Sequence, residues 1–341
     1  MAVSGSAAPL PLNLRASLPP ELRGLRRDHV RLLVADRQSG GLTHTRFDRI
    51  GDHLRPGDVL VVNRSRTLPA AVPAIRDDGT IVQLRPCVRR AGTWDALSVE
   101  PQPPHANVPL NDGETLVVGR SVIAQVLGRR SDIPLLWRMR LDGDGVEELL
   151  RLGEPIRYSY VPSRVPVDYY QTVFADRPGS AEMPSAGRPF SWELLDSLQT
   201  NGVRRADLVL HTGLSSYQDD DVDAEHLLYE EWFEVPAATA AAVNSAARVI
   251  AVGTTVVRAL ETVANDDGHV HAGHGWTRLR ISPNSRLRSV DGLLTGMHEP
   301  QASHFELLGA FLSEEQLLRA YTEAVDRGYL WHEFGDTMLI L

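Results

Sequence analysis

The chain contains no lysine, so all 35 of its basic residues are arginine. Schiff-base enzymes, pyridoxal phosphate enzymes, P-loop nucleotidases and protein kinases each need a lysine amine. The sequence therefore excludes these classes. It also lacks the motifs G-x-G-x-x-G, G-x-S-x-G and H-E-x-x-H, which removes the usual signatures of dinucleotide binding, of the hydrolase nucleophile elbow and of zinc proteases.

Cysteine and long apolar runs are also scarce. The single Cys87 excludes internal disulfides and multi-cysteine metal sites. No apolar run is long enough to span a bilayer, and the proline-broken start of the chain does not have the pattern of a signal peptide. His269, His271 and His274 share a glycine-bearing loop, but no carboxylate or cysteine pattern nearby completes a metal site. We expect a cytoplasmic protein without membrane contact, metal or bound cofactor.

A length of 341 residues suffices for two domains, and the net charge of −9 gives no overall basic field that would attract nucleic acid. Local clusters of arginine remain. They are Arg23, Arg26, Arg27 and Arg31 near the start, and Arg278, Arg280, Arg286 and Arg288 near the end. Given the acidic balance, a solvated arginine-rich face explains either cluster more simply than RNA binding.

Residues 248–261 form the stretch around which the chain is organised. The apolar run 249–252 predicts a short strand buried on both faces, as in a parallel sheet. Gly253 allows a sharp turn, and Thr254 or Thr255 is expected to cap the helix that follows. Such a turn offers free N–H groups and the positive end of a helix dipole, and Arg258 could hold a carboxylate there. A turn that binds nothing is the simpler alternative.

Residues 72–153 have a different texture, in which short alternating strands are separated by turn clusters. The segments that qualify are 81–84, 94–99, 114–118, 122–127 and 136–141. We interpret them as a small antiparallel β-barrel or sandwich inserted into an α/β domain. The predicted domains are residues 1–71 plus 154–341 for the α/β domain that carries the active site, and residues 72–153 for the inserted barrel.

Other short strands of the α/β domain are predicted to end beside polar residues. Asn63 and Arg66 follow the strand 59–62, and His211 and Gly213 follow the strand 207–210. Polar groups at the carboxyl end of a strand are candidates for a site, although a capped turn explains Asn63 nearly as well. Residues 162–189 form a loop too long for a simple connector, and loops of this kind tend to carry function.

In their order along the chain these motifs resemble one family, the S-adenosylmethionine:tRNA ribosyltransferase-isomerases of queuosine biosynthesis. Residues 248–261 are similar to the most constant block of that family. The other matching segments are 61–66 with Pro69 and Ala70, 170–175 with Gly179 and Ser180, 291–295 with His298 and Pro300, and 335–340. The resemblance covers nearly the whole chain.

The resemblance implies an α/β domain with an inserted six-stranded antiparallel barrel. It also implies a reaction that moves the ribosyl part of S-adenosylmethionine onto the aminomethyl group of a 7-deazaguanine base in tRNA. The product is epoxyqueuosine, and adenine and methionine are released. S-adenosylmethionine is then a co-substrate and tRNA a partner, although the acidic balance counts against tRNA binding. We expect a monomer.

This chemistry needs a base for the acidified C5′ hydrogens, an acid for the departing adenine and a cation or helix N-terminus for the methionine carboxylate. The candidate acids and bases at family-matching positions are His298, His211, Glu231 and Asp336, whose roles the sequence does not rank. A backbone hydrogen bond explains His211 equally well, and a helix cap or ion pair explains Asp336. The expected substrate-binding residues are Gly253, Thr254, Thr255, Arg258, Asn63, Arg66, Gln171, Ser185, Gly187 and Gly213.

Several positions depart from the family pattern. The motif P-T-A-G-L-H-F is here Pro184-Ser-Ala-Gly-Arg-Pro-Phe190, so Pro189 replaces a histidine. Ser215 alters the glycine-rich turn after His211. Tyr229 replaces one of two paired histidines, of which His226 remains. The remaining departures are the aspartates that begin at Asp219, in place of a basic residue and proline, and Gly296-Met297, in place of asparagine–phenylalanine.

Two rival functions stay open because of these departures. One is a paralogue that transfers the ribosyl part of S-adenosylmethionine to a small nucleoside or metabolite. The other is a protein that binds the donor without catalysis, since Pro189 can neither donate nor accept a proton.

Overall fold

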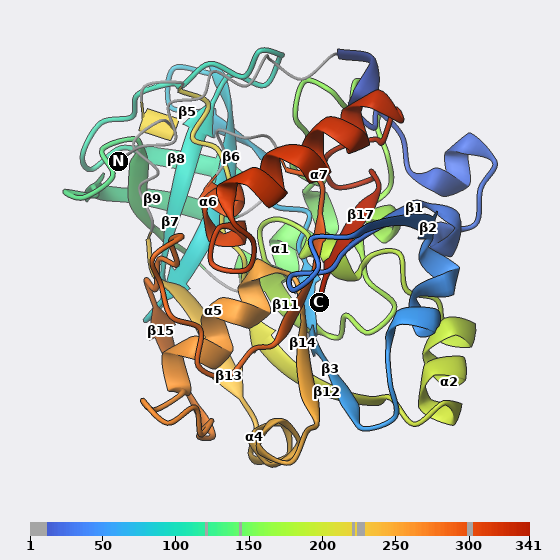
Figure 1. Cartoon of the computed structure of the whole chain (residues 1–341). Coiled ribbons are helices and arrows are strands. Elements are labelled where there is room, and N and C mark those ends of the chain that lie inside the picture. Colours follow the sequence, from blue (N-terminus) through green and yellow to red (C-terminus); the bar gives the residue numbers. More distant parts are fainter. Residues whose placement is uncertain (1–11, 120–121, 143–144, 220–221, 224–228, 299–302) are drawn as a thin grey trace.

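The computed structural model describes residues 12–119, 122–142, 145–219, 222–223, 229–298 and 303–341. It contains a nine-stranded mixed sheet, a closed six-stranded barrel and a small parallel pair formed by β4 (Ser65–Thr67) and β11 (Arg177–Ser180). Figure 1 shows the barrel next to the sheet edge that carries β15. His226, Pro300 and the aspartates at 220 and 221 lie outside the described residues.

The central sheet is built mainly from short apolar strands. Its order is β15 (Gly273–Thr277), β13 (Glu231–Val235), β12 (Arg204–Leu210), β3 (Asp58–Asn63), β14 (Arg248–Val252), β16 (Gly292–Gly296), β17 (Thr337–Ile340), β1 (Arg31–Ala35) and β2 (Leu42–Arg46). The four neighbours β12, β3, β14 and β16 run parallel. Their carboxyl ends therefore meet at one edge of the sheet, which is where α/β sheets bind ligands.

Strand β14 is buried on both faces, as its apolar run predicts. Val249 and Ala251 pack with the helices α4 (Ala237–Asn244), α5 (Thr254–Val263), α6 (Ser303–Leu308) and α7 (Glu314–Asp326). Ile250 and Val252 pack on the other face with α2 (Trp192–Thr200) and the 3-10 helix η4 (Phe47–His53). The sheet therefore lies between two helical layers.

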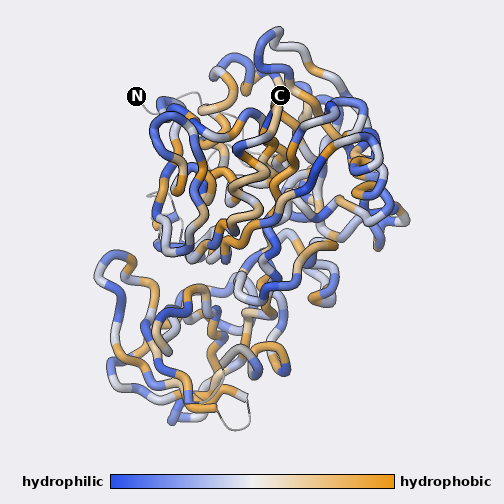
Figure 2. Tube along the Cα trace, turned by 90° about the horizontal axis from the view of Figure 1, so that it is seen from below, coloured by the Kyte–Doolittle hydropathy of each residue, from blue (hydrophilic) through white to orange (hydrophobic). Residues whose placement is uncertain are grey.

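The predicted inserted barrel is confirmed. Its strands are β5 (Val72–Arg76), β6 (Ile81–Arg90), β7 (Thr93–Val99), β8 (Thr115–Val118), β9 (Val122–Arg129) and β10 (Leu136–Leu141), closed in the order β10-β7-β6-β5-β8-β9. Strands of the main sheet precede and follow it in the chain, and α1 (Gly145–Leu152) comes directly after it. Figure 2 shows the barrel and the larger α/β body as two adjoining parts, each with hydrophobic segments inside.

The start of α5 differs from the prediction that Thr254 or Thr255 caps it. The N-cap is Gly253, with φ 95°, and no side chain caps the helix, so the prediction was wrong. The Thr255 hydroxyl instead accepts a hydrogen bond from Asn63 Nδ2 at 3.3 Å. The positive φ explains why glycine occupies this position.

The loop 162–189 is more structured than the sequence suggests. It contains the 3-10 helices η5 (Val167–Tyr170) and η6 (Ser185–Gly187) and the strand β11, which pairs with β4. Its residue Phe174, and Phe190 directly after the loop, join the core on the α2 side of the sheet. The loop therefore packs across the ends of the central strands.

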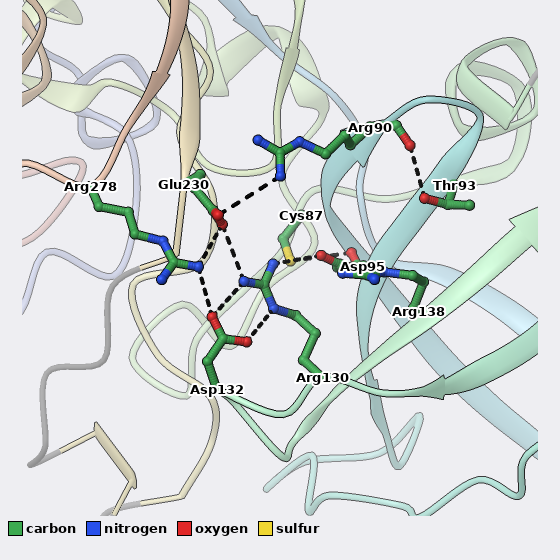
Figure 3. Close-up of polar contacts among 9 residues, drawn as sticks. All are labelled: Cys87, Arg90, Thr93, Asp95, Arg130, Asp132, Arg138, Glu230 and Arg278. Carbon is green, nitrogen blue, oxygen red and sulfur yellow. Dashed lines mark hydrogen bonds and ion pairs between the residues drawn. The ribbon is translucent and has the colours of Figure 1, made fainter.

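An ion-pair cluster joins the barrel to the sheet (Figure 3). The side chain of Arg130 is only 6% exposed and contacts Asp95 of β7 at 2.6 Å, Asp132 at 2.7 Å and Glu230, just before β13, at 3.1 Å. Arg278, just after β15, contacts Asp132 at 2.8 Å and Glu230 at 2.9 Å. Because removing one member of a buried ion pair leaves a charge unpaired, this cluster holds the barrel in a fixed position against the sheet.

Ser191 provides a test of how helix α2 is held. Its hydroxyl oxygen accepts from Leu194 N at 3.2 Å and its hydroxyl donates to Asp28 at 2.7 Å. Ser191→Ala should lower the free energy of unfolding by about 1–2 kcal/mol, the usual cost of losing an N-cap. Urea denaturation measures the loss, and Thr200→Ala at the exposed end of the same helix is the control. Equal losses in the two variants would contradict the capping role.

Candidate active site

The edge where the parallel strands end brings together residues that are far apart in the sequence. Asn63 ends β3, His211 follows β12, Gly253 follows β14 and Gly296 ends β16. These four strands are direct neighbours in the sheet. The predicted site residues on these strands therefore share one edge.

Asn63 holds this edge together. Its side-chain oxygen accepts from Leu210 N and from Ser65 N, each at 3.0 Å. Its side-chain nitrogen donates to Leu210 O at 2.8 Å and to Thr255 Oγ1 at 3.3 Å. The amide thus joins β3, β12 and the start of α5, and all its ordinary hydrogen-bonding positions are occupied. These bonds satisfy the side chain of Asn63, which is only 1% exposed, and its contact with substrate stays a prediction.

Gln171 and Asp336 are also engaged within the chain. Gln171 accepts from Thr67 N at 3.1 Å and donates to Thr67 O at 2.8 Å, as a neighbouring strand would. Asp336 accepts from the backbone N–H groups of Arg31 and Leu330, each at 2.7 Å, and from Arg31 Nε at 3.0 Å. Both side chains position backbone segments, and their contact with substrate stays a prediction.

The turn at Gly253 is buried beneath η6. A Cβ built on Gly253 would lie 3.4 Å from the Cβ of Ala186, and one built on Gly187 would lie 2.7 Å from Phe174. Thr254 and Thr255 are 8% and 7% exposed. A molecule that approaches this edge would therefore meet η6, at Ser185, before it met the turn.

A small hollow lies on that side of η6. Its lining includes Ser185, Pro189, Gly296, Glu333 and Asp336. All of them except Glu333 come from three segments of the chain that the sequence analysis associated with the site. The hollow is therefore the place where the separated motifs face a common space.

His298 lies beside Gly296, one of the residues that line this hollow. Its Nε2 is 3.0 Å from the hydroxyl oxygen of Thr295. A Cβ built on Gly296 would lie 4.0 Å from His298 Nε2 and 4.0 Å from Ser185 Oγ. The missing side chain at Gly296 therefore leaves room between an imidazole and a hydroxyl, which can exchange a proton with a bound molecule.

His211 is a neutral imidazole at pH 7. Its Nδ1 is 2.7 Å from Ser65 Oγ, and its ring stacks on Trp232 with the centroids 5.2 Å apart. A Cβ on Gly179 would come within 2.4 Å of the ring, so this glycine makes room for the histidine. Burial lowers the pKa of His211 to about 4. The histidine contacts a side-chain hydroxyl rather than a backbone group, and a neutral imidazole can accept a proton.

Glu231 and Arg258 form a pair beside Gly213. One carboxylate oxygen of Glu231 accepts from Gly213 N at 2.9 Å, and the other contacts Arg258 Nη1. Arg258 Nε donates to Leu279 O at 2.9 Å. Its remaining nitrogen, Nη2, is buried and has no hydrogen-bond partner within the described part of the chain. A buried, unpaired guanidinium N–H is costly unless something binds it.

Arg66 lies on the small sheet at the same edge. It is partly exposed on β4, in register with Pro178 of β11. Among the residues that the structure describes, no carboxylate pairs with it. Its guanidinium can therefore hold an anionic group, and the predicted role in substrate binding stays open to test.

Two departures from the family pattern are accommodated in the loop after His211. The hydroxyl of Tyr229 contacts Leu214 N, and a Cβ on Gly213 would lie only 1.6 Å from that hydroxyl. Ser215 N donates to Glu182 Oε1 at 2.9 Å, and Ser215 Oγ is 3.1 Å from the Tyr158 hydroxyl. Each replacement is therefore part of a hydrogen-bonded loop.

The replacement of histidine by Pro189 comes with a buried arginine. Arg188 is 2% exposed, contacts Glu21 at 2.8 Å and donates from Nε to Tyr169 O at 2.8 Å. Its guanidinium also lies over the ring of Phe334, 5.2 Å from the centroid. This segment fixes the wall of the hollow but supplies no proton.

The aspartates in place of a basic residue serve their own loop. Asp223 accepts from Tyr217 N at 2.7 Å and from Ser216 Oγ at 2.6 Å. Asp219 accepts from Val222 N at 3.1 Å. Both described carboxylates thus stabilise the local backbone.

Sequence reasoning missed two carboxyl groups at the site. Glu182 contacts the Tyr158 hydroxyl, and Glu333 accepts from the Tyr160 hydroxyl at 2.7 Å. The rings of Tyr158 and Tyr160 stack with centroids 5.9 Å apart, and Tyr160 stacks on His332 at 3.9 Å. Burial raises the pKa of both carboxyl groups.

These two acids could not be found from local patterns. The partners in the hydrogen bonds are 24 and 173 residues apart in the sequence. The tyrosine pair just before the long loop was the only available signal. Glu333 lines the hollow, and a raised pKa makes a carboxyl group better suited to act as a general acid.

Neither a metal nor a membrane is suggested by the described residues. Within them no group of three or more histidine, cysteine, aspartate or glutamate side chains could hold a metal ion. His269 and His271 contact each other through their rings, 4.9 Å apart. None of the helices in the described ranges is both long and apolar enough to cross a bilayer.

Comparisons with known proteins agree with this geometry. A family model described as "Queuosine biosynthesis protein" matches residues 9–340. The chain is 39% identical to the S-adenosylmethionine:tRNA ribosyltransferase-isomerase of Moorella thermoacetica, over 92% of this chain and 94% of that protein. It is 38% identical to the protein of the same name from Thermus thermophilus, over 95% and 97% of the two chains.

A solved structure resembles the chain along its whole length. The crystal structure of S-adenosylmethionine tRNA ribosyltransferase from Thermotoga maritima matches with a TM-score of 0.54 and 28% sequence identity. The match covers 98% of this chain and 99% of that one.

The lowered pKa of His211 predicts a pH-dependent stability. The unfolded imidazole, with a pKa of about 6.5, binds a proton that the folded one, with a pKa of about 4, does not. The folded state therefore loses stability as the pH falls below about 6.5. Relative to His211→Asn, the wild type should lose roughly 1–2 kcal/mol between pH 7 and pH 5, allowing for partial exposure. Urea denaturation of both proteins at both pH values measures this. Equal losses of stability in the wild type and in His211→Asn would disprove the lowered pKa of His211.

Proposed function

The chain belongs to the S-adenosylmethionine:tRNA ribosyltransferase-isomerase family, and we propose that the hollow beside η6 and the adjoining strand ends form its active site. The enzyme transfers and isomerises the ribosyl part of S-adenosylmethionine onto a 7-aminomethyl-7-deazaguanine base in tRNA. The product is epoxyqueuosine in tRNA, and adenine and methionine leave. We place the enzyme in the cytoplasm, where it acts on tRNA as a monomer.

One observation carries this proposal. The family match spans residues 9–340, and three of its separated segments line the same hollow through Ser185, Gly296 and Asp336. His298, two residues after Gly296 at the end of β16, adjoins the space beside Gly296. A hollow shared by distant matched segments is expected where substrate binds.

We assign the methionine carboxylate of the donor to Arg258. The buried Nη2 of this arginine has no partner in the described structure, while Glu231 fixes the other side of the guanidinium. A carboxylate would supply the missing acceptor. In this role Glu231 positions both Arg258 and the Gly213 loop and does not itself transfer a proton.

We assign the proton transfers to groups that face the hollow or lie beside it. The sulfonium of the donor acidifies the C5′ hydrogens, so a neutral imidazole can remove one of them. His298 lies beside Gly296, which lines the hollow, and His211, whose lowered pKa leaves its imidazole neutral at pH 7, is a second candidate at the same edge. Adenine leaves more readily when it is protonated, and Glu333 lines the hollow with a raised pKa.

The decisive test is mass spectrometry of the protein incubated with S-adenosylmethionine and tRNA that carries the 7-deazaguanine base. The wild type should release adenine and methionine and increase the mass of the base. His298→Ala should lower adenine release by about 100-fold or more, as expected for loss of a general acid or base. Glu333→Gln, which can still accept from Tyr160, should lower it by a similar factor.

Three outcomes would count against these assignments. If adenine is released only with small acceptors, the acceptor substrate is a small molecule and not tRNA. Donor binding without turnover would mean that the chain is not catalytic. Unchanged turnover in a folded His298→Ala variant would remove His298 from the mechanism.

The Arg258 assignment needs a test that separates donor binding from the ion pair. Arg258→Gln should weaken S-adenosylmethionine binding by about 10-fold to 100-fold, the usual value of a hydrogen bond to a charged group. It also leaves Glu231 unpaired. The double variant Arg258→Gln with Glu231→Gln removes that unpaired charge and should still bind the donor weakly in calorimetry. If the double variant binds like the wild type, Arg258 serves only to neutralise Glu231.

A further inference from the structure

The junction between the barrel and the sheet combines buried and exposed charges (Figure 3). Arg130 is 6% exposed and Asp132 is 36% exposed. The side chains of Asp95 and Glu230 are 7% and 22% exposed. Those of Arg90, Arg138 and Arg278 are 52%, 51% and 47% exposed. The three most exposed side chains of this cluster are therefore arginines, although the whole chain carries a net charge of −9.

The exposed guanidinium groups use only some of their N–H donors in these ion pairs. Arg278 uses only Nη2 for its ion pairs, Arg138 only Nε, and Arg90 only Nη1 at a long 3.8 Å. Since a guanidinium has five N–H donors, most of those on these three arginines are available to another anion. Arginine in this state suits the bidentate binding of phosphate.

The same face of the barrel carries a further arginine. Arg140 is exposed and forms no ion pair with the described carboxylates. In the barrel Thr93 is in register with Arg90 on one side and with Arg140 on the other. A row across β6, β7 and β10 thus has an arginine at each end. Arg138, two residues before Arg140 on β10, points to the same face.

An aromatic row connects this positive face to the active site. Arg90 lies over the ring of Trp276, 4.4 Å from its centroid. Trp276 is directly opposite Trp232 in the antiparallel pair β15–β13, so both indoles lie on one face of the sheet. Trp232 in turn stacks on His211. Both tryptophans are partly exposed.

We propose that this surface, formed by Arg90, Arg138, Arg140, Arg278, Trp276 and Trp232, binds a single-stranded loop of the tRNA and leads it to the active site. Exposed arginines neutralise phosphates, and partly exposed indoles offer surfaces on which unpaired bases stack. The proposal rests on the proposed function for the identity of the RNA. It also explains how an acidic protein holds a polyanion, since the binding charge is local.

The other arginine cluster of the chain is a useful contrast. Arg26 pairs with Asp28, and Arg31 pairs with Asp336 while donating to two carbonyl groups. Arg23 donates to the carbonyl oxygen of Phe334 at 2.8 Å. Arg23 and Arg31 hold the start of the chain against its end. Unlike the arginines at the barrel junction, the arginines of this cluster are engaged with groups of the chain itself.

The test measures RNA binding apart from turnover. Fluorescence anisotropy with a labelled RNA hairpin, compared with a blunt duplex of equal charge, gives affinity and its salt dependence. Arg138→Gln with Arg140→Gln should weaken hairpin binding about 10-fold near physiological salt and lower the salt slope by about one to two. Trp276→Ala should weaken it about 10-fold, whereas Trp276→Phe should keep most of the affinity.

The chain offers a matched control. Arg205 lies over the exposed ring of Trp192, 5.8 Å from the centroid, at the start of β12 and far along the sheet from the site. Arg205→Gln with Trp192→Ala should leave hairpin binding unchanged. Arg140→Gln alone breaks no ion pair in the described structure, so a loss of binding in this variant cannot be attributed to a broken ion pair. Thermal unfolding shows whether each variant is folded.

The outcomes separate this inference from the proposed function. If the wild type releases adenine with tRNA but the surface variants bind the hairpin normally, the surface assignment is wrong and the function stands. If the variants lose hairpin binding but no tRNA supports turnover, the surface stands and the function is wrong. Equal loss in the Arg205–Trp192 control, a preference for the duplex, or no RNA binding by the wild type would each overturn the surface assignment.

Discussion

A single buried amide, that of Asn63, sets the geometry on which the site depends. It ties the end of β3 to the end of β12 and reaches the first turn of α5 through Thr255. Parallel strands joined in this way end level with each other, so the residues that follow them face a common space. The positions of His211, Gly253 and Gly296 are consequences of that alignment. An amide can do this with neutral groups, where a charged side chain would have carried a large desolvation cost.

The barrel is held to this edge by charge as well as by a shared hydrophobic cluster, which Leu214, Tyr217 and Tyr229 of the α/β body join. Arg130 contacts three carboxylates, and one of them, Glu230, directly precedes the residue that holds Arg258. The same cluster that fixes the barrel therefore adjoins the proposed donor contact. Arginine suits this task, since it stays charged when buried and its planar fork can face several carboxylates at once. The absence of lysine from the chain leaves every such position to arginine.

Much of the fold could be predicted because its local signals agree with its tertiary structure. The run 249–252 and Gly253 define β14 and its turn, and alternation defines five of the six barrel strands. Strand β5 was not identified as a strand, since Pro73 argues against one; its side chain is exposed, between two inward-facing residues. The capping of α5 could not be foreseen, since the hydroxyl of Thr255 is taken by Asn63, 192 residues away.

The site was predicted less completely for the same reason. Family-matching residues do gather at one edge, but the sequence could not tell that η6 covers the turn at Gly253 or that Asp336 and Gln171 are engaged with backbone groups. The acids Glu182 and Glu333 were missed because their tyrosine partners come from another part of the chain. Long-range pairing of this kind leaves no periodic trace in a sequence.

The contact between Gly213 and Tyr229 also constrains how this enzyme can evolve. The Tyr229 hydroxyl stands 1.6 Å from the point where a side chain at position 213 would begin. Substitutions at the two positions are therefore epistatic, because a methyl group at 213 is tolerated only after the ring at 229 has been reduced in size. Natural variation at this pair should follow an order in which position 229 changes first, and a laboratory library that mutates position 213 alone would return only glycine.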